Sequence, residues 1–124
     1  MLKKIYSATV HVTDQDRALA FYRDVLGMEV RDDQAFGPGM RWLVVAPQGA
    51  ETGLVLYKSG EDTPAAGSWT GIVLYTDDMA KDYAAWSAQG VQFSHEPKSE
   101  MWGLETQFTD PDGNGFDLVQ PAHR

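Results

Sequence analysis

The chain has 124 residues, of which 43% are hydrophobic, so it is long enough to form one domain with a buried core. It contains no cysteine, which excludes disulfides, thiolate nucleophiles, zinc–thiolate sites and iron–sulfur clusters. The formal net charge of −8 disfavours a nucleic-acid partner, whereas an acidic surface either attracts a cationic small molecule or only keeps the protein soluble.

The first predicted strand covers residues 5–12, IYSATVHV, where apolar and polar side chains alternate. Because the N-terminal stretch lacks the continuous apolar run of a signal peptide, and no other run could span a bilayer, we expect a cytoplasmic protein with no membrane partner. Thr13 and Asp14 provide capping oxygens for a helix that Gly27 ends. Strands are then predicted at 28–31, in RWLVVA and in TGLVLYK, so that residues 1–58 form a βαβββ unit.

The same order of elements recurs in residues 69–121, after a predicted linker at 59–68. A strand in GIVLYT leads to a helix that Asp77 and Asp78 cap and Gly90 ends. Corresponding residues lie 63 positions apart (77 minus 14, 90 minus 27), as in an internal repeat. The second unit ends in a predicted hairpin whose turn is DPDGN.

The paired βαβββ units, the passage AFYRDVLGMEV and the terminal FTDPDGNGFDLVQ resemble the vicinal oxygen chelate superfamily of glyoxalases, bleomycin resistance proteins and extradiol dioxygenases. The resemblance covers essentially the whole chain, residues 1–124, as a single domain of that superfamily. It implies an α+β fold in which two βαβββ repeats form curved mixed sheets around a cavity. It also implies a homodimer, with or without exchange of the two units. This scaffold carries both enzymes and metal-free binding proteins, so the fold alone does not decide the function.

Metal-using members of that superfamily take ligands resembling His, Glu or His, His and Glu from four strands. The corresponding positions of this chain are Ser7, Val55, Gly71 and Asp117. Only Asp117 has a carboxylate, whereas a divalent ion needs several converging donors. We therefore expect no metal and no cofactor, as in the metal-free binding members.

The three histidines do not replace the lost ligands. His11 shares a strand face with Ser7, but four residues of extended chain separate them by about 13 Å. His95 is expected near a strand end and His123 in the terminal tail. Backbone groups or water are sufficient partners for such imidazoles.

The alternation also predicts which residues line the concave side of the sheets. In the first strand Tyr6, Ala8, Val10 and Val12 suit packing against the helices. The same parity in the other strands, together with Trp102 in the KSEMWG loop as a residue that closes over a ligand, gives the candidate ligand-binding residues Ser7, Thr9, His11, Trp42, Val55, Tyr57, Gly71, Val73, Tyr75, Trp102 and Asp117. The set is mostly apolar and aromatic with a few polar groups, as expected of a small-molecule site.

Ordinary packing is the alternative for each tryptophan of this set, and Trp86 is expected in the core beside Tyr83. Gly71 lies in mid-strand, where a missing side chain permits the close approach of a ligand or another backbone.

Two classes of function follow. The first is a metal-independent binding protein that sequesters a small aromatic molecule, neutral or cationic, such as a natural product or antibiotic. The second is a lyase, isomerase or dioxygenase of the same superfamily, or a metal-free enzyme that uses His11 or Asp117 as an acid or base. The loss of three ligand positions favours binding over catalysis.

Overall fold

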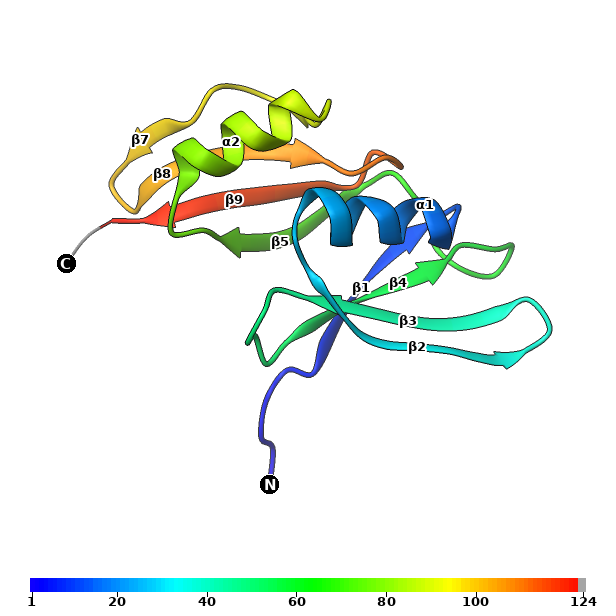
Figure 1. Cartoon of the computed structure of the whole chain (residues 1–124). Helices are drawn as coiled ribbons and strands as arrows, with labels where there is room; N and C mark the ends of the chain where they lie inside the picture. Colours follow the sequence, from blue (N-terminus) through cyan, green and yellow to red (C-terminus); the bar gives the residue numbers. More distant parts are fainter. Residues whose placement is uncertain (123–124) are drawn as a thin grey trace. The chain divides into compact units, whose positions relative to one another are not determined.

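A computed structural model describes residues 1–122, and His123 lies outside the described residues. The chain forms two compact units, one comprising residues 1–67 and the other beginning at residue 68 (Figure 1). Each unit contains one mixed sheet and one helical segment, which confirms the predicted α+β class. No helix among residues 1–122 has both the length and the apolarity needed to cross a membrane.

The first unit has the predicted βαβββ order. Its elements are β1 (Ser7–Val12), α1 (Gln15–Leu19), η1 (Ala20–Val25), β2 (Glu29–Gly37), β3 (Met40–Ala46) and β4 (Gly53–Lys58). They form sheet A in the order β1-β4-β3-β2, with β1 parallel to β4 and the other pairs antiparallel. Asp14 begins the helix as predicted, because its carboxylate accepts a hydrogen bond from the Arg17 backbone N–H.

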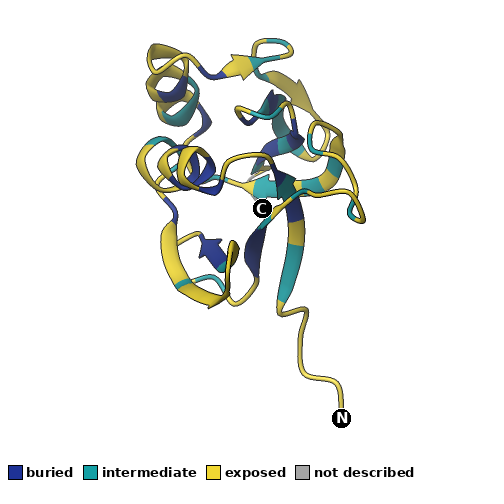
Figure 2. Cartoon of the chain, turned by 90° about the vertical axis from the view of Figure 1, so that its right-hand side faces the viewer, coloured by how far each residue is buried: buried dark blue, intermediate teal, exposed yellow. Residues whose placement is uncertain are grey.

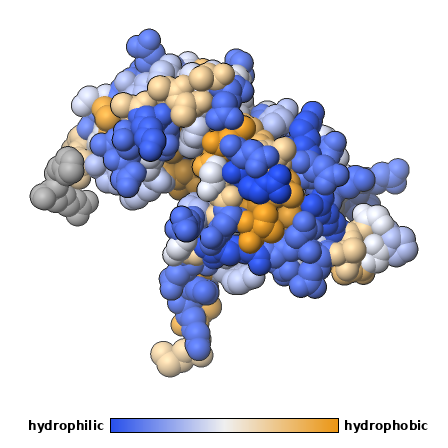
Figure 3. Space-filling model, viewed as in Figure 1, coloured by the Kyte–Doolittle hydropathy of each residue, from blue (hydrophilic) through white to orange (hydrophobic). Residues whose placement is uncertain are grey.

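Two elements of the first unit differ from the sequence prediction. The single helix changes to π-helical geometry at η1, where the Leu26 N–H donates to the carbonyl of Phe21, five residues earlier. Strand β2 extends to Gly37 instead of ending at residue 31, because it pairs with β3 along most of its length. The Gly/Pro-rich loop is therefore a short turn at the tip of the β2–β3 hairpin, where Figure 3 shows hydrophobic side chains and where Phe36 and Met40 are exposed.

The core of the first unit lies between α1–η1 and sheet A. The buried side chains are Val10, Val12, Ala18, Leu19, Phe21, Tyr22, Leu43, Val45, Leu54 and Leu56. Full burial of one such aliphatic side chain contributes about 1.5–3 kcal/mol. Gln15 joins the helix to the sheet, since its side-chain amide donates to the carbonyls of Leu56 and Arg41. The assignment of Tyr6 to this core is wrong, because Tyr6 precedes β1 and is 58% exposed in the exposed N-terminal segment (Figure 2).

The second unit forms a related sheet with one additional short strand. Its elements are β5 (Trp69–Tyr75), α2 (Met79–Ala88), β6 (Gln92–Phe93), β7 (Lys98–Glu100), β8 (Gly103–Thr109) and β9 (Gly115–Pro121). Sheet B has the order β5-β9-β8-β6, and β7 pairs with β8 where the sequence predicted a KSEMWG loop. Asp78 caps α2 by accepting from the Lys81 N–H, so the two caps lie 64 positions apart (78 minus 14) instead of the predicted 63.

The DPDGN turn joins β8 to β9, which confirms the predicted hairpin. The buried Asp110 carboxylate accepts from the backbone N–H groups of Asp112 and Asn114 and from the Asn114 side-chain amide, each over 2.9 Å. Gly113 has a φ of 86°, which a residue without a side chain adopts at little cost. These bonds fix the register of β8 against β9, on which the geometry of the site depends.

An aromatic cluster fills the space between α2 and sheet B. The Trp86 ring packs edge-on against Phe108 with centroids 5.3 Å apart, and Phe108 stacks on Phe116 at 5.4 Å. Trp86 is 8% exposed, which confirms its predicted place in the core. The opposite face of sheet B therefore carries the remaining side chains of β5, β8 and β9.

Candidate ligand-binding site

The strand registers bring the predicted residues of the first unit onto one face of sheet A. Thr9 pairs with Val55 and His11 with Tyr57, while Val44 of β3 pairs with Val55. Paired residues point to the same face, and Trp42 shares it by alternation along β3. Ser7 shares it too, and the rings of His11 and Tyr57 lie 6.1 Å apart in an edge-to-face arrangement.

This face of sheet A is the one away from α1. Arg41, the neighbour of Trp42 in β3, forms an ion pair of 2.7 Å with Asp16 in α1 and therefore lies on the helix side. Trp42 is half-buried and Thr9 is exposed, whereas Val55 is buried among its strand neighbours.

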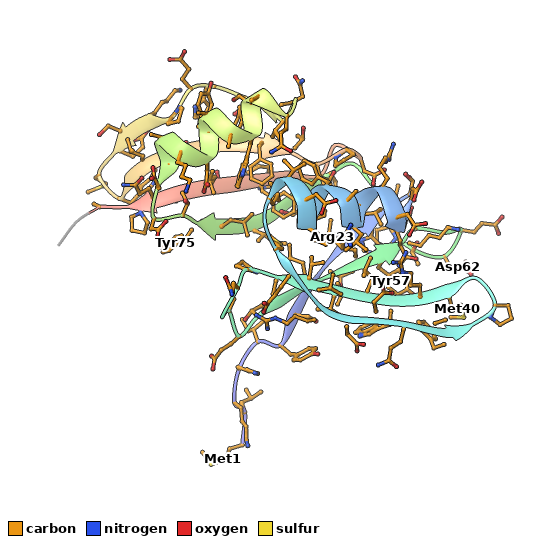
Figure 4. All side chains as sticks on the ribbon, viewed as in Figure 1. Met1, Arg23, Met40, Tyr57, Asp62 and Tyr75 are labelled. Atoms are coloured by element: carbon orange, nitrogen blue, oxygen red, sulfur yellow. The ribbon has the colours of Figure 1, made fainter. Side chains whose placement is uncertain are left out.

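The predicted residues of the second unit share the face of sheet B opposite α2. Val73 pairs with Asp117 and Tyr75 with Val119, while Asp117 also pairs with Gln107 of β8. Figure 4 shows Tyr75 on the side of β5 away from α2, and Tyr75 is 74% exposed. β5 is an edge strand, so this row of side chains borders an open sheet edge.

Gly71 lies at an irregularity of β5 and has open space around it. Its φ is 74°, in the left-handed region, and the register between β5 and β9 shifts between Trp69 and Val73. A Cβ added at Gly71 would meet no atom within 4 Å. Gly71 therefore does not mark the close approach of another part of the backbone, whereas close approach of a ligand stays a prediction, and the positive φ of this glycine accompanies the irregularity in the β5–β9 register.

A pocket of about 250 Å³ opens on this face of sheet B. Its lining residues are Trp69, Gln92, Phe93, Ser94, Gln107, Phe108, Thr109 and Gly115. The indole of Trp69 lies against Gly115, since a Cβ at residue 115 would come 2.6 Å from the indole Cε3 atom. One wall of the pocket is therefore aromatic. The polar groups that line the pocket are amides and hydroxyls.

None of the residues predicted from the sequence lines this pocket, but Asp117 adjoins it. Trp69 was missed because the predicted strand began at Gly71, although Trp69 has the same parity as Gly71 and Val73. Trp102 lies in the β7–β8 turn, at the opposite end of β8 from the pocket. The length of β8 separates the two tryptophans by about 20 Å, so Trp102 does not close over this pocket.

A row of polar contacts joins the pocket to Asp117 and continues beyond it. Ser94 Oγ donates to Gln107 Oε1 over 3.4 Å, and Gln107 Nε2 donates to Asp117 Oδ1 over 3.3 Å. Glu105 is the next residue of β8 on this face, and its carboxyl interacts electrostatically with Asp117. His95 completes the row, with its Nε2 atom 3.5 Å from Glu105 Oε1.

Glu105 is the electrostatically unusual group of this row. Burial raises the pKa of its carboxyl above the ordinary value, and the hydrogen bond and negative charge of Asp117 raise it further. The positive charge of His95 opposes this rise, whereas Glu100 adds to it. Sequence analysis missed Glu105, although the alternation of LETQF places it on the same face as Gln107.

The residues present do not fit a metal ion. Val55 and Gly71 provide no side-chain donor at two of the four family positions, and Ser7 is a weak donor. Within the described part of the chain, residues 1–122, no group of three or more His, Asp or Glu side chains is arranged to hold one.

Comparisons with known proteins agree with this architecture. A family model described as the Glyoxalase/Bleomycin resistance protein/Dioxygenase superfamily matches residues 4–118. The YetH protein of Bacillus subtilis (strain 168) is 37% identical over 120 residues, which cover 97% of this chain and 100% of YetH.

Two solved structures are similar over nearly their whole length. A member of the same superfamily from Sphaerobacter thermophilus DSM 20745 has a TM-score of 0.89 and 40% identity, covering 96% of this chain and 98% of its own. TnmS3, an antibiotic binding protein from Streptomyces sp. CB03234, has a TM-score of 0.85 and 38% identity, covering 98% of both chains.

Proposed function

Because the chain belongs to the Glyoxalase/Bleomycin resistance protein/Dioxygenase superfamily, we propose that it binds a small aromatic molecule without a metal and thereby sequesters a natural product or antibiotic. The observation that carries this proposal is the pocket beside Trp69 on the face of sheet B opposite α2. The similarity to an antibiotic binding protein supports the choice of ligand class. In this proposal the protein binds and releases the ligand without changing it chemically.

The chemistry of the pocket suits a flat ring with polar substituents. The exposed face of Trp69 offers a stacking surface, and an aromatic pair contributes about 0.5–1.5 kcal/mol beyond area burial. The amides of Gln92 and Gln107 and the hydroxyl of Ser94 are placed to bond carbonyl or hydroxyl groups at the ring edge. A volume of about 250 Å³ holds one ring system, so a larger ligand would extend over the neighbouring Val73 and Tyr75.

The proposed ligand-binding set therefore joins the sequence-predicted residues other than Trp102 to the pocket residues. In the second unit it includes Asp117, which gives the pocket a negative neighbour and favours ligands that carry donors or a positive charge. In the first unit the shared face of His11, Tyr57 and Trp42 is a further proposed ligand surface.

A homodimer is part of this proposal. Strands β1 and β5 are edge strands of their sheets, and open edges present unpaired backbone groups. Trp69, Val73 and Tyr75 expose apolar surface along β5. Two-fold pairing of chains would cover such edges with an identical surface, and the ligand pockets would then include residues of both chains.

A second candidate function is catalysis, and the contact between His95 and Glu105, with Asp117 on the same face, is the observation that favours it. An imidazole next to a carboxyl pair is an arrangement that can hold and move a proton. A lyase or isomerase could use Asp117 or Glu105 as the base. His11, the other predicted acid or base, lies in the first unit, where its ring packs edge-on against Tyr57.

The test is a titration of the protein with a panel of flat aromatic antibiotics, followed by mass spectrometry of the ligand. We expect saturable quenching of tryptophan emission and recovery of the ligand with unchanged mass. Recovery of a new product would support the enzyme instead. A panel without any saturable quenching would count against the pocket beside Trp69.

A further inference from the structure

Gln107 lies in the middle of a row of three residues that runs across sheet B. It pairs with Asp117 of β9 on one side, and on the other side its carbonyl accepts from the backbone N–H of Ser94 over 2.9 Å. Lateral neighbours in a sheet place their side chains on the same face. The Gln107 amide consequently reaches both neighbours, with Nε2 at 3.3 Å from Asp117 Oδ1 and Oε1 at 3.4 Å from Ser94 Oγ.

Asp117 sets the orientation of the Gln107 amide. A carboxylate can only accept hydrogen bonds, whereas a primary amide has a donor end, Nε2, and an acceptor end, Oε1. Nε2 therefore faces Asp117, and this turns Oε1 toward Ser94. Ser94 lines the pocket and Asp117 does not, so the oxygen is the end of the amide that lies on the pocket side.

Ser94 passes this polarity on to the pocket. Its hydroxyl has one hydrogen and two lone pairs. Because Gln107 Oε1 can only accept, the hydrogen of Ser94 Oγ is directed to it. Lone pairs are then what Ser94 Oγ offers to a ligand. A ligand that needs to accept a hydrogen bond from Ser94 has to break the bond between Ser94 and Gln107 first.

The second amide of the pocket has the same polarity. Gln92 Nε2 donates to the Gly90 carbonyl over 3.5 Å, so its donor end is turned to the segment before β6 and its oxygen is the end that serves a ligand. Gln92 pairs with Thr109, Thr109 with Gly115, and Gly115 with Trp69. The hydrogen-bond acceptors therefore lie at the β6 end of the pocket, and the indole of Trp69 lies at the β5 end.

We propose that the pocket beside Trp69 selects aromatic ligands with a hydrogen-bond donor at the ring edge, a ring N–H or a phenolic O–H, and that Asp117 is the positioning residue that imposes this selection through Gln107 and Ser94. The inference rests on the proposed function, because it names the class of ligand for the same pocket. Asp117 does not touch the ligand in this arrangement. The selection depends on the direction of hydrogen bonds and therefore applies to uncharged ligands.

The test compares indole with benzofuran in titrations followed by nuclear magnetic resonance at neutral pH. Both compounds are flat, uncharged and of nearly the same shape, but indole has a ring N–H where benzofuran has an oxygen. The signals of the Trp69 indole N–H and of the backbone N–H groups of Ser94 and Gln107 report the two affinities. The measured quantity is the ratio of the indole affinity to the benzofuran affinity. Comparing this ratio between protein variants cancels the different ease with which the two compounds leave water.

Asp117→Asn should lower this ratio by about two- to tenfold, the effect of one neutral hydrogen bond. An amide at residue 117 pairs with either end of the Gln107 amide, so the orientation is no longer imposed. Gln107→Leu should lower the ratio in the same way, because the hydrogen of Ser94 Oγ then becomes available to the benzofuran oxygen. Asp62→Asn is the matched control, since it removes an exposed carboxylate of the first unit and should leave the ratio unchanged.

The outcomes separate the selection from the proposed function. A merely structural loss would weaken both compounds together and keep the ratio. An unchanged ratio in Asp117→Asn overturns the positioning role of Asp117, and an unchanged ratio in Gln107→Leu overturns selection through Ser94, while the binding function stands in both cases. Folded wild-type protein in which neither compound shifts the signals of the pocket contradicts the proposed aromatic site, and with it the selection.

Discussion

The indole of Trp69 fills the space in which a side chain at residue 115 would lie. Residues 69 and 115 are paired in the register of β5 and β9, and a Cβ on Gly115 would approach the indole Cε3 atom to 2.6 Å and Cζ3 to 3.1 Å. The absence of a side chain at Gly115 therefore positions the aromatic wall of the pocket. The orientation of Trp69 is a consequence of sheet register and not of a contact with a ligand.

Gly115→Ala should displace Trp69 and lower the stability of the fold. Insertion of a methyl group into occupied space costs about 1–3 kcal/mol. Denaturant unfolding would measure this loss, and the tryptophan emission of the folded variant should change. Gly60→Ala is the matched control, because a Cβ at Gly60 meets no atom within 4 Å. Equal stability of the two variants would show that Trp69 does not pack on Gly115.

Glu105→Gln should stabilise the protein more as the pH rises. The pKa of Glu105 is raised in the folded state, so its favourable contribution is complete below the ordinary value of about 4.3 and is lost as the pH rises through the folded pKa. Glutamine keeps the uncharged form at every pH. The difference in free energy of unfolding between variant and wild type should therefore grow from pH 4 to pH 8 in denaturant titrations. A difference that stays constant or shrinks would contradict the assigned direction.

Alternation along each strand could predict which side chains share a face of a sheet, because the two-residue period depends only on local strand geometry. Val73, Tyr75 and Asp117 share a face for this reason. The pocket could not be predicted, since it depends on which residues of different strands become neighbours. Gly71 shifts the register of β5, and only this shift and the β9 register place Trp69 over Gly115.

The row of polar side chains beside Asp117 could not be predicted from the sequence for a similar reason. Glu105 lies on a strand adjacent to β9, and its parity was readable in LETQF, but a glutamate on a strand face is commonly just solvated. His95 comes from the segment between β6 and β7, which has no periodicity that fixes its position. The pairing of β7 with β8 and the hydrogen bond from the Thr106 hydroxyl to the His95 carbonyl fix that segment beside Glu105.

The protein should be a homodimer in solution. Light scattering at micromolar concentration would measure the mass, with 13.7 kDa expected for a single chain and twice that for the dimer. Val73→Asp places a charge on the exposed surface of β5, at a residue 51% exposed, and should weaken association without unfolding the chain. A wild-type mass of one chain at every concentration would refute the dimer.

Binding should not require a transition metal. Elemental analysis of the purified protein should find less than a stoichiometric amount of zinc, nickel, manganese or iron, because the donor set Ser7, Val55, Gly71 and Asp117 does not suit one. Treatment with a chelator should leave ligand affinity unchanged. One tightly held metal ion per chain, removable only with loss of binding, would overturn this expectation.

The charge of Asp117 should matter chiefly for cationic ligands. Asp117→Asn removes a negative charge beside the pocket and largely keeps the side-chain shape. Affinity for a cationic aromatic compound should fall more than affinity for an uncharged compound of the same ring system, as measured by fluorescence titration. Equal losses for both compounds would indicate that Asp117 acts through Gln107 alone.

The central claim is that a flat aromatic ligand binds beside Trp69, and a paired titration of two tryptophan variants tests it most directly. Trp69→Ala removes the aromatic wall of the pocket, whereas Trp102→Ala removes a tryptophan of similar exposure, 54%, at the far end of β8. For a ligand selected from the antibiotic panel, Trp69→Ala should weaken binding by about tenfold, the effect of losing roughly 1.4 kcal/mol of stacking. Trp102→Ala should bind like the wild type. A Trp69→Ala variant with wild-type affinity, or a larger loss in Trp102→Ala, would contradict the assignment of the site.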